Sequence, residues 1–241
     1  MEGPSLVILK ESIKSFKRKK ILAASGTAKI DTQELIGQKI VDFKSWGKHF
    51  LIVFKKFSLR LHFLMFGSYR INEQKLATPR LSLKFEEGEL NFYTCSVVKI
   101  EGELDNIYDW AGDVMSSQWN SAKARKKIKL SPEATVSDIL LDQTIFAGVG
   151  NIIKNEVLFR IRVHPESVIK SLPARKLTAL IAEAKNYSFD FYRWKKLFVL
   201  RKHWLIYTKK KCSHCRGPVS KKYTGLTKRR SFFCDRCQIL Y

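Results

Sequence analysis

Four cysteines near the C-terminus have the spacing that points most directly to chemistry. They form two CxxC pairs, CSHC and CDRC, and they are Cys212, Cys215, Cys234 and Cys237. Four thiolates complete the tetrahedral coordination of zinc and leave no position for a catalytic water, so the pattern predicts one structural zinc ion. The alternative is four unligated thiols in a reducing compartment. The fifth cysteine, Cys95, is expected to be a buried apolar thiol.

The first residues, MEGPS, place a carboxylate beside the amino terminus. Glu2 is followed by a rigid Gly3-Pro4 step, so the segment is either an unimportant tail or a working part of the molecule. An α-amine has a pKa of about 7.7–8.0, against about 10.4 for lysine, and part of it is therefore neutral and nucleophilic at pH 7. A carboxylate one residue away could move protons for such an amine.

Three further segments could contact an anionic polymer. In GVGN, two glycines permit close backbone approach and Asn151 begins a helix, whose free N–H groups attract an anion; an ordinary helix connection is the alternative. In SWGKH, Lys48 follows a glycine at the start of a strand, where it could also be a plain surface residue. In LHFLMFGS, Met65 lies at the expected end of a strand, where it could insert into a base stack or tuck into the core.

The overall charge favours a polyanionic partner. The 241 residues include 45 Lys and Arg against 22 Asp and Glu, a net charge of +23. Such an imbalance indicates nucleic acid first and a membrane surface a distant second, with a merely soluble basic protein as the bland alternative. Since no apolar run is long enough for a membrane span, the expected location is the cytoplasm, in association with the nucleoid, and no membrane partner is expected.

The hydrophobic period changes along the chain. Leu59, Leu61 and Phe63 alternate with polar residues, as do Leu81, Leu83 and Phe85, which predicts an antiparallel β-sandwich up to about residue 110. The opening stretch from about Gly3 to Phe16 could instead be a helix with Ile8, Ser12 and Ile13 near one face. Residues 113 to about 200 are helical in period, with Ser131 as a plausible N-cap before Pro132. The last segment is too small to fold on an apolar core alone and depends on the metal.

These motifs, taken in order, resemble the formamidopyrimidine-DNA glycosylase / endonuclease VIII family of base-excision repair, and the endonuclease VIII-like members in particular. The resemblance covers essentially the whole chain and rests on the EGP opening, the GK strand, the segment from His62 to Ser68, the GVGN…NE…HP pattern and the C-terminal finger. It implies an α+β multidomain fold: an N-terminal antiparallel β-sandwich, a helical helix–two-turn–helix domain and a C-terminal four-cysteine zinc finger. The expected domains are 1–111, 112–204 and 205–241, with DNA in the cleft between the lobes.

The resemblance also implies roles for single residues. The amine of Met1 would attack C1′ of the damaged nucleotide and form a Schiff base, with Glu2 handling protons. Lys48 would contact the phosphates that flank the lesion, and the same phosphates would be held by Asn151 and by Arg229, with Arg230 as the alternative if the finger is shifted by one residue. His62 is expected as a further backbone contact. Met65 would fill the gap that the flipped base leaves in the duplex.

The sequence departs from the family pattern at its nucleophile. The family usually begins Met-Pro-Glu-Gly-Pro and exposes the proline, whereas Met1 here directly precedes Glu2. The expected activity is that of a bifunctional DNA glycosylase and abasic-site lyase acting by β,δ-elimination on duplex DNA, as a monomer. The lack of an Arg-x-Phe pair in NFYTCSVVKI favours oxidised pyrimidines as substrates. The alternatives are a glycosylase for formamidopyrimidine or 8-oxoguanine lesions and a catalytically impaired damage-binding protein.

Overall fold

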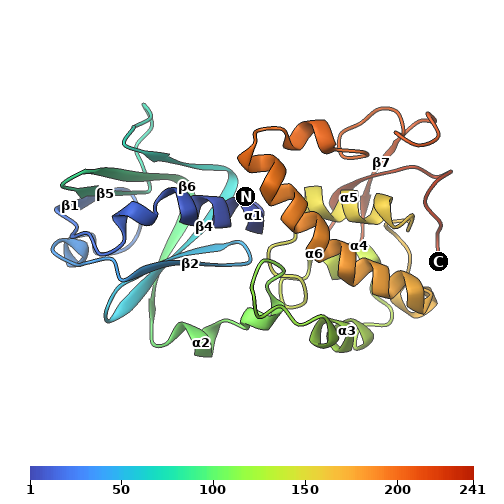
Figure 1. Cartoon of the computed structure of the whole chain (residues 1–241), viewed down its shortest axis with the longest axis horizontal. Helices are drawn as coiled ribbons and strands as arrows, with labels where there is room; N and C mark the ends of the chain where they lie inside the picture. The colour runs from blue at the N-terminus through green and yellow to red at the C-terminus, as the bar shows by residue number, and fades with distance from the viewer. The chain divides into compact units, whose positions relative to one another are not determined.

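The chain folds as two compact units in a computed structural model that describes all 241 residues. The first unit comprises Met1 and Gly3–Tyr108, and the second comprises Glu2 and Asp109–Tyr241. Figure 1 shows the strands of the first unit in blue to green and the helices of the second unit mostly in green to orange. Each unit has its own hydrophobic core, and each is described here by itself.

The first unit is built on six antiparallel strands in the order β1-β5-β6-β4-β3-β2. The strands are β1 (Ala23–Ser25), β2 (Asp42–Trp46), β3 (His49–Val53), β4 (Phe57–Ile71), β5 (Leu81–Phe85) and β6 (Gly88–Glu101). Two 3₁₀ turns, η1 (Lys14–Phe16) and η2 (Gln33–Leu35), and the short helix α2 (Leu104–Ile107) complete the unit together with α1 (Gly3–Ser12).

The two longest strands divide this sheet into the two layers of a sandwich. The pairing of β4 with β6 shifts register between Phe63 and Ser68. Before this shift, β4 pairs with β3 as well as with β6. After it, β4 pairs with the part of β6 that also pairs with β5. Phe50 of β3 and Phe92 of β6 meet across the interior with ring centroids 6.3 Å apart. The predicted sandwich is therefore confirmed, and it forms because alternate apolar residues of both halves face one core.

Cys95 lies inside this core, as expected for an unpartnered thiol. It is buried in β6, and burial raises its pKa to about 11. A thiol in this environment stays protonated and packs as a small apolar group.

The predicted N-terminal helix is confirmed, and of the three residues expected near one face only Ile13 is buried. Helix α1 buries Leu6 and Leu9, and Ile13 continues this face just beyond the helix, whereas Ile8 is half-buried and Ser12 is exposed. The Ser12 hydroxyl donates to the carbonyl of Ile8 at 2.9 Å, which satisfies it within the helix. Leu6, Leu9 and Ile13 follow one another at spacings of three and four residues and so form one apolar stripe along the helix. This stripe determines which face of α1 is buried.

The second unit contains four helices that surround a single apolar core. They are α3 (Ser121–Lys129), α4 (Val136–Leu141), α5 (Asn151–Arg160) and α6 (Ala174–Lys196), with 3₁₀ turns η3 (Trp110–Gly112), η4 (Ile169–Ser171) and η5 (Leu200–His203) between them. The helical faces predicted from the sequence are buried in this core: Val136, Ile139, Leu140, Leu177, Leu180, Ile181 and Ala184. A two-stranded hairpin, β7 (Ser220–Thr224) and β8 (Arg229–Phe233), lies in the finger that follows.

Helix α4 begins later than the predicted N-cap. The helix starts at Val136, and Thr135 is its cap, since the Thr135 hydroxyl oxygen accepts from the amide of Asp138 at 3.2 Å. Ser131 instead begins a turn, with its carbonyl accepting from the amide of Ala134. The prediction was wrong because Ser131 and Thr135 are both residue types that favour a helix N-cap. The helix begins after Thr135, since the buried apolar residues follow it.

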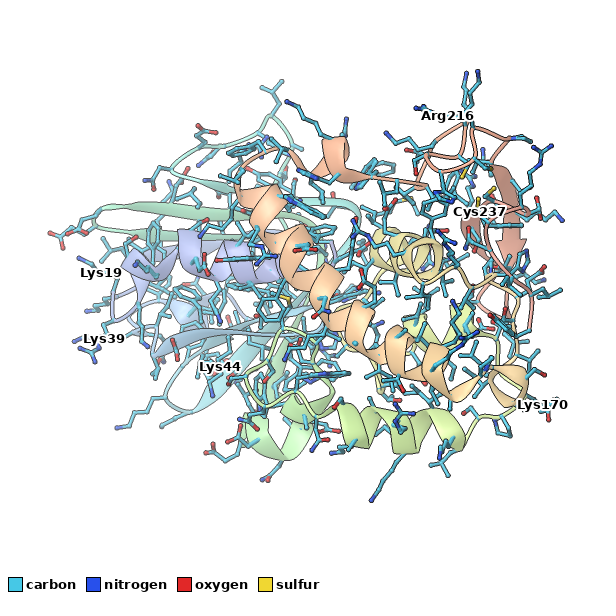
Figure 2. The ribbon with its side chains drawn as sticks, turned by 45° about the vertical axis from the view of Figure 1, so that its right-hand side comes forward. Lys19, Lys39, Lys44, Lys170, Arg216 and Cys237 are labelled. Atoms are coloured by element: carbon cyan, nitrogen blue, oxygen red, sulfur yellow. The ribbon has the colours of Figure 1, made fainter.

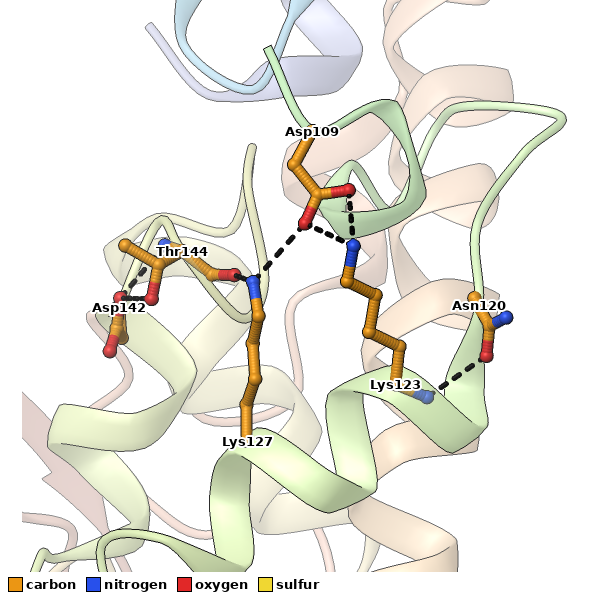
Figure 3. Close-up of polar contacts among 6 residues, drawn as sticks. All are labelled: Asp109, Asn120, Lys123, Lys127, Asp142 and Thr144. Carbon is orange, nitrogen blue, oxygen red and sulfur yellow. Dashed lines mark hydrogen bonds and ion pairs between the residues drawn. The ribbon is translucent and has the colours of Figure 1, made fainter. Parts of the chain in front are cut away.

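An acidic residue at the start of the second unit fixes the loops that lead to the glycine motif. Asp109 accepts from the ammonium groups of Lys123 and Lys127, at 2.8 Å and 3.2 Å (Figure 3). The hydrogen bond from Lys123 is the main cause that holds the pKa of Asp109 below its usual value. Lys127 also donates to the carbonyl of Thr144 at 2.6 Å, so α3 is tied to the segment just before GVGN.

A buried carboxylate on α5 anchors the segment that enters the finger. Glu156 is fully buried and accepts from the amides of Leu205, Ile206 and Tyr207 at 2.8 to 3.1 Å. Asp138 on α4 likewise accepts from the amides of Leu226 and Thr227 at the hairpin turn. Because these bonds join the helices to residues 205–241 in one compact unit, the division between 112–204 and 205–241 stays a prediction.

No helix is both long enough and apolar enough to cross a membrane. The longest helix, α6, carries basic and acidic side chains along its whole length.

We expect Glu156→Ala to lower the free energy of unfolding by about 3 kcal/mol, because three buried N–H groups would lose a charged acceptor. Urea denaturation followed by circular dichroism measures this change. Glu133→Ala is the matched control: its carboxylate is exposed and pairs only with Lys170, so it should change the unfolding free energy by less than about 1 kcal/mol. An equal effect of both variants would contradict the anchoring role of Glu156.

Candidate DNA-repair site

The four cysteines meet at one point in the finger. Their sulfur atoms all lie within 4.8 Å of one another, with Cys212 and Cys237 3.8 Å apart and Cys215 and Cys234 3.5 Å apart. Tetrahedral zinc with Zn–S bonds of about 2.3 Å places its sulfur ligands about 3.8 Å apart. The cluster therefore fits a closed four-thiolate metal site, and Cys237 is labelled at this end of the finger in Figure 2.

The glycine motif forms the N-terminus of α5, and Glu2 binds there. The amide of Ile152 donates to one carboxylate oxygen of Glu2 at 2.7 Å, and the amide of Ile153 donates to the other at 3.3 Å. These N–H groups have no partner within the helix, and the positive end of the helix dipole favours a negative charge. Two amides at this helix start thus bind the protein's own carboxylate, whereas the sequence pattern predicts a DNA phosphate there.

Gly150 makes this approach possible. A Cβ atom at Gly150 would lie 2.5 Å from both Cγ and Cδ of Glu2, closer than real side chains come. Gly148 has φ +99°, a left-handed conformation that glycine adopts without strain. Its amide donates to the side chain of Gln143, whose own amide nitrogen donates to the carbonyls of Leu141 and Val149.

The polar face of α5 is bonded to strand β8 of the finger. The side-chain amide of Asn151 donates to the carbonyl of Arg230 at 2.9 Å, and its oxygen is buried without a hydrogen-bond partner. Asn155 accepts from the amide of Phe232 at 2.7 Å. Asn151 therefore joins the helix start to the finger, and its expected phosphate contact stays a prediction.

The two candidate arginines of the finger face opposite sides of the hairpin. Arg230 packs against its cross-strand partner Tyr223, to whose hydroxyl it donates at 2.9 Å. Arg229 lies on the same face of β8 as Ser231, and its charge acts on Lys154 of α5. The charges of Arg229 and Glu2 both act on Lys154, with Arg229 lowering its pKa and Glu2 raising it.

Lys154 is a buried ionisable residue of this region that sequence reasoning missed. It is fully buried, and its ammonium group donates to the hydroxyl of Ser231 at 2.7 Å. Burial lowers its pKa to about 8, with a further lowering by Arg229, while Asp138 and Glu2 oppose the shift. The available signal was the position of Lys154 three residues after Asn151, on the same helical face.

The first unit brings three of the predicted residues together. Lys48 lies in the turn between β2 and β3 and is half-buried, next to Gly47 with φ +53°. Burial lowers the pKa of His62, the positive charges of the Met1 amine and of Lys48 lower it further, and a hydrogen bond to the backbone of Lys48 opposes the shift. The charges of the Met1 amine and of Lys48 therefore act on His62, and the net effect disfavours its protonated imidazole.

Met65 points into solvent rather than into the core. It lies in β4 at the register shift and is 71% exposed, beside Phe66, which is 88% exposed at φ +67°. The expected strand end is wrong, because β4 continues to Ile71 through this bulge. The alternative of a buried Met65 is excluded, and a wedge role stays a prediction.

Two family models match the chain with this geometry. The formamidopyrimidine-DNA glycosylase N-terminal domain matches residues 6–95, and the formamidopyrimidine-DNA glycosylase H2TH domain, the helix–two-turn–helix, matches residues 111–187. Together they cover well over half of the sequence, in the order that the motifs predict. The chain belongs to the formamidopyrimidine-DNA glycosylase / endonuclease VIII family.

Individual relatives divide between the two branches of this family. Endonuclease 8-like 3 of Mus musculus is 30% identical over 209 residues, which are 80% of this chain and 33% of the mouse protein. Formamidopyrimidine-DNA glycosylase of Aliivibrio fischeri is 25% identical over 232 residues, 86% of this chain and 84% of that protein. The chain spans about a third of the length of the endonuclease 8-like 3 relatives.

Solved structures share the fold over nearly the whole chain. A viral DNA glycosylase is 20% identical with a TM-score of 0.86, covering 99% of this chain and 100% of that one. Lactococcus lactis formamidopyrimidine-DNA glycosylase, solved with DNA that contains an abasic site, is 22% identical with a TM-score of 0.87 and 99% coverage of both chains. These likenesses confirm the fold class: a β-sandwich, a helix–two-turn–helix domain and a four-cysteine finger.

We expect the buried ammonium of Lys154 to make stability depend on pH. Its pKa is about 8 in the folded protein, below the ordinary 10.5, so the unfolded chain binds more protons between these values and folding becomes more favourable as pH rises through that window. Relative to Lys154→Met, the wild-type free energy of unfolding should increase by about 2 kcal/mol from about pH 8 to about pH 9.5.

Urea denaturation of both proteins across this range measures the difference, and the comparison cancels the titration of the other lysines. Lys170→Met, at an exposed lysine, serves as control and should follow the wild-type curve. Parallel curves for wild type and Lys154→Met would contradict the assignment.

Proposed function

We propose that this chain is a bifunctional DNA glycosylase and abasic-site lyase whose nucleophile is the amine of Met1. The amine attacks C1′ of the damaged nucleotide, the bond from C1′ to the base breaks, and opening of the sugar leaves an imine. β-Elimination and then δ-elimination release the 3′ and 5′ phosphates of the former sugar. The partner is duplex DNA with a damaged base or an abasic site, bound by a monomer in the cytoplasm beside the nucleoid.

The observation that carries this proposal is the fixed carboxylate of Glu2. Two backbone amides of α5 hold its oxygens, and Gly150 leaves room for the side chain. One peptide bond joins the residue that bears this carboxylate to Met1. A group that must take and return protons at a neighbouring amine and sugar needs such a defined position.

The electrostatics around the amine support nucleophilic chemistry. Lys48 and Arg60 also act on His62, as the Met1 amine does, so several positive charges share this part of the first unit. Neighbouring cations favour the neutral form of an amine, which is the nucleophilic form. The same cations suit the phosphates on either side of a flipped nucleotide.

The grip on DNA would come from basic and apolar groups that the fold exposes. Arg229 of the finger hairpin would supply a cation for the DNA backbone. The cysteine cluster of the finger fits one structural zinc ion, which would supply folding stability rather than chemistry. Met65 and Phe66 form an exposed apolar tip of the kind that enters a base stack when a nucleotide is flipped.

Oxidised pyrimidines are the substrate class that we favour. The supporting observations are the endonuclease 8-like relatives and the absence of an Arg-x-Phe pair in β6. Formamidopyrimidine or 8-oxoguanine lesions are the second candidate, favoured by the Aliivibrio fischeri relative.

Borohydride reduction on DNA with an abasic site tests the lyase chemistry. We expect a covalent adduct whose peptide map places the DNA on Met1, because reduction fixes the imine. Glu2→Gln should lower base excision by about a hundredfold or more while binding to abasic-site DNA persists. The damage-binding alternative predicts tight binding with no adduct, and that result would overturn the lyase assignment.

We expect Gly150→Ala to separate binding from base excision as well. The added methyl group would displace Glu2 and break its bonds to Ile152 and Ile153, so excision should fall about tenfold or more. Single-turnover excision and DNA binding are measured side by side. Gly112→Ala is the matched control, since its Cβ would make an ordinary contact at 3.4 Å and both activities should stay near wild type. Unchanged excision in Gly150→Ala would argue against the position given to Glu2.

A further inference from the structure

A surface groove of the second unit lies between α3 and α6, where these two helices pack against each other (Figure 1). Its volume is about 600 Å³, within the range of about 300–1,000 Å³ that is usual for ligand sites. We call it the α3–α6 groove, and the residues that matter for its chemistry are Trp119, Ala122, Arg125, Lys126, Ile181 and Lys185.

The floor of the α3–α6 groove is apolar. Ile181 is buried there, and the half-buried ring of Trp119 stacks on Phe146 with ring centroids 5.7 Å apart. Ala122 and Ala182 are exposed and carry small side chains, so the space between the helices stays open. Such a floor can receive apolar side chains of a partner, whereas a phosphate placed against it would lose its hydration without gaining a partner.

Every charged side chain that lines the α3–α6 groove is basic. Arg125 and Lys126 come from α3 and Lys185 from α6, and both lysines are exposed. The guanidinium group of Arg125 donates to the hydroxyl of Thr178 on α6 at 2.8 Å. Because this partner is neutral, the positive charge of Arg125 remains available to a ligand.

Two carboxylates close to these helices bind other cations. Asp109 accepts from Lys123 and Lys127, the two basic residues of α3 that do not line the groove at its open side. Glu183 of α6 lies 3.8 Å from Arg160. Neither carboxylate therefore neutralises the cations of the α3–α6 groove.

A groove in the first unit shows what distinguishes this one. It is lined by Lys29, Asp31, Glu34 and Lys99 together with apolar residues, so it contains charges of both signs. The ammonium group of Lys99 binds Glu34 at 2.6 Å, which leaves that cation with a partner of its own. An apolar floor combined with positive charge alone is found in the α3–α6 groove.

We propose that the α3–α6 groove docks an acidic amphipathic helix of a partner protein. Apolar side chains of that helix lie on Trp119 and Ile181, and its carboxylates pair with Arg125, Lys126 and Lys185. Complementary charge of this kind governs the choice of partner and the rate of association. The inference does not depend on the proposed function, because no residue of the groove belongs to the candidate DNA-repair site.

Fluorescence anisotropy of the full chain with a labelled synthetic peptide tests the proposal. The probe is a helical peptide of about 18 residues built from Glu, Ala and Leu, with its leucines along one face. At about 0.15 M salt we expect a dissociation constant of about 50 μM or lower. The same peptide with every Glu replaced by Gln, and a scrambled peptide of the same composition, should each bind about fivefold more weakly or worse.

Two charge reversals in the groove locate the binding site. Lys126→Glu and Lys185→Glu should each weaken binding of the acidic peptide about fivefold or more, because an attraction becomes a repulsion. Lys129→Glu is the matched control: it makes the same charge change at an exposed position of α3 outside the groove and should alter the affinity less than about twofold. Affinity for an undamaged DNA duplex, measured in parallel, should change less than about twofold in all three variants.

Several results would overturn the docking site. They are a wild-type protein that does not bind the peptide, a scrambled or Gln peptide that binds as tightly as the probe, and wild-type affinity in both groove variants. A loss of affinity for DNA equal to the loss for the peptide would instead identify a second nucleic-acid contact and exclude the proposal. Thermal melting identifies a folding defect, and Lys126→Gln and Lys185→Gln, which only remove the charge, then replace the reversed variants.

Discussion

The N-terminus of α5 is the position on which the candidate site depends. A helix start carries amide groups without internal partners, and here two of them hold the oxygens of Glu2. The bond is possible only because residue 150 has no side chain. The carboxylate of Glu2 is thereby fixed by backbone atoms, whose positions follow from the packing of Ile153 and Val157 in the helical core. The position of the second residue of the chain thus depends on residues far along the sequence.

Helix α5 also holds the finger in place through hydrogen bonds. Three polar side chains on one face of α5 bond to the backbone and side chains of β8. Glu156, turned toward the entering segment, accepts three further amides. The four cysteines lie on either side of the β7–β8 hairpin in the sequence, and α5 bonds to β8. The finger has few apolar residues, so these contacts give it a defined conformation. The two-residue period of β8 places Arg229 and Ser231 on one face of the strand and Arg230 on the other.

Much of this arrangement could be predicted from the sequence, and the errors have physical reasons. Cysteine spacing and the glycine motif specify their local structure through covalent and steric limits, so the cluster of four cysteines and the start of α5 were predicted correctly. The start of helix α4 was predicted too early, because Ser131 and Thr135 are both good N-cap residues. Only the burial of Val136 decides between them. Lys154 could not be predicted as a buried group, since lysine is normally exposed and its hydroxyl partner lies far away in sequence. Strand β4 was expected to end near Gly67, but pairing with β6 resumes immediately afterwards and carries the strand through a bulge.

The proposed reaction would differ from that of a proline nucleophile in one step. A secondary amine gives an iminium ion on attack at an aldehyde carbon, whereas a primary amine gives an imine that must be protonated before elimination. In the proposed reaction the carboxylate of Glu2, on the next residue and held by two amides, would carry that proton. Proton transfer to the imine nitrogen would then replace the permanent charge of the iminium ion. The consequence is that elimination in this chain should depend on the protonation state of the imine, and Glu2 would then matter for strand cleavage as well as for base excision.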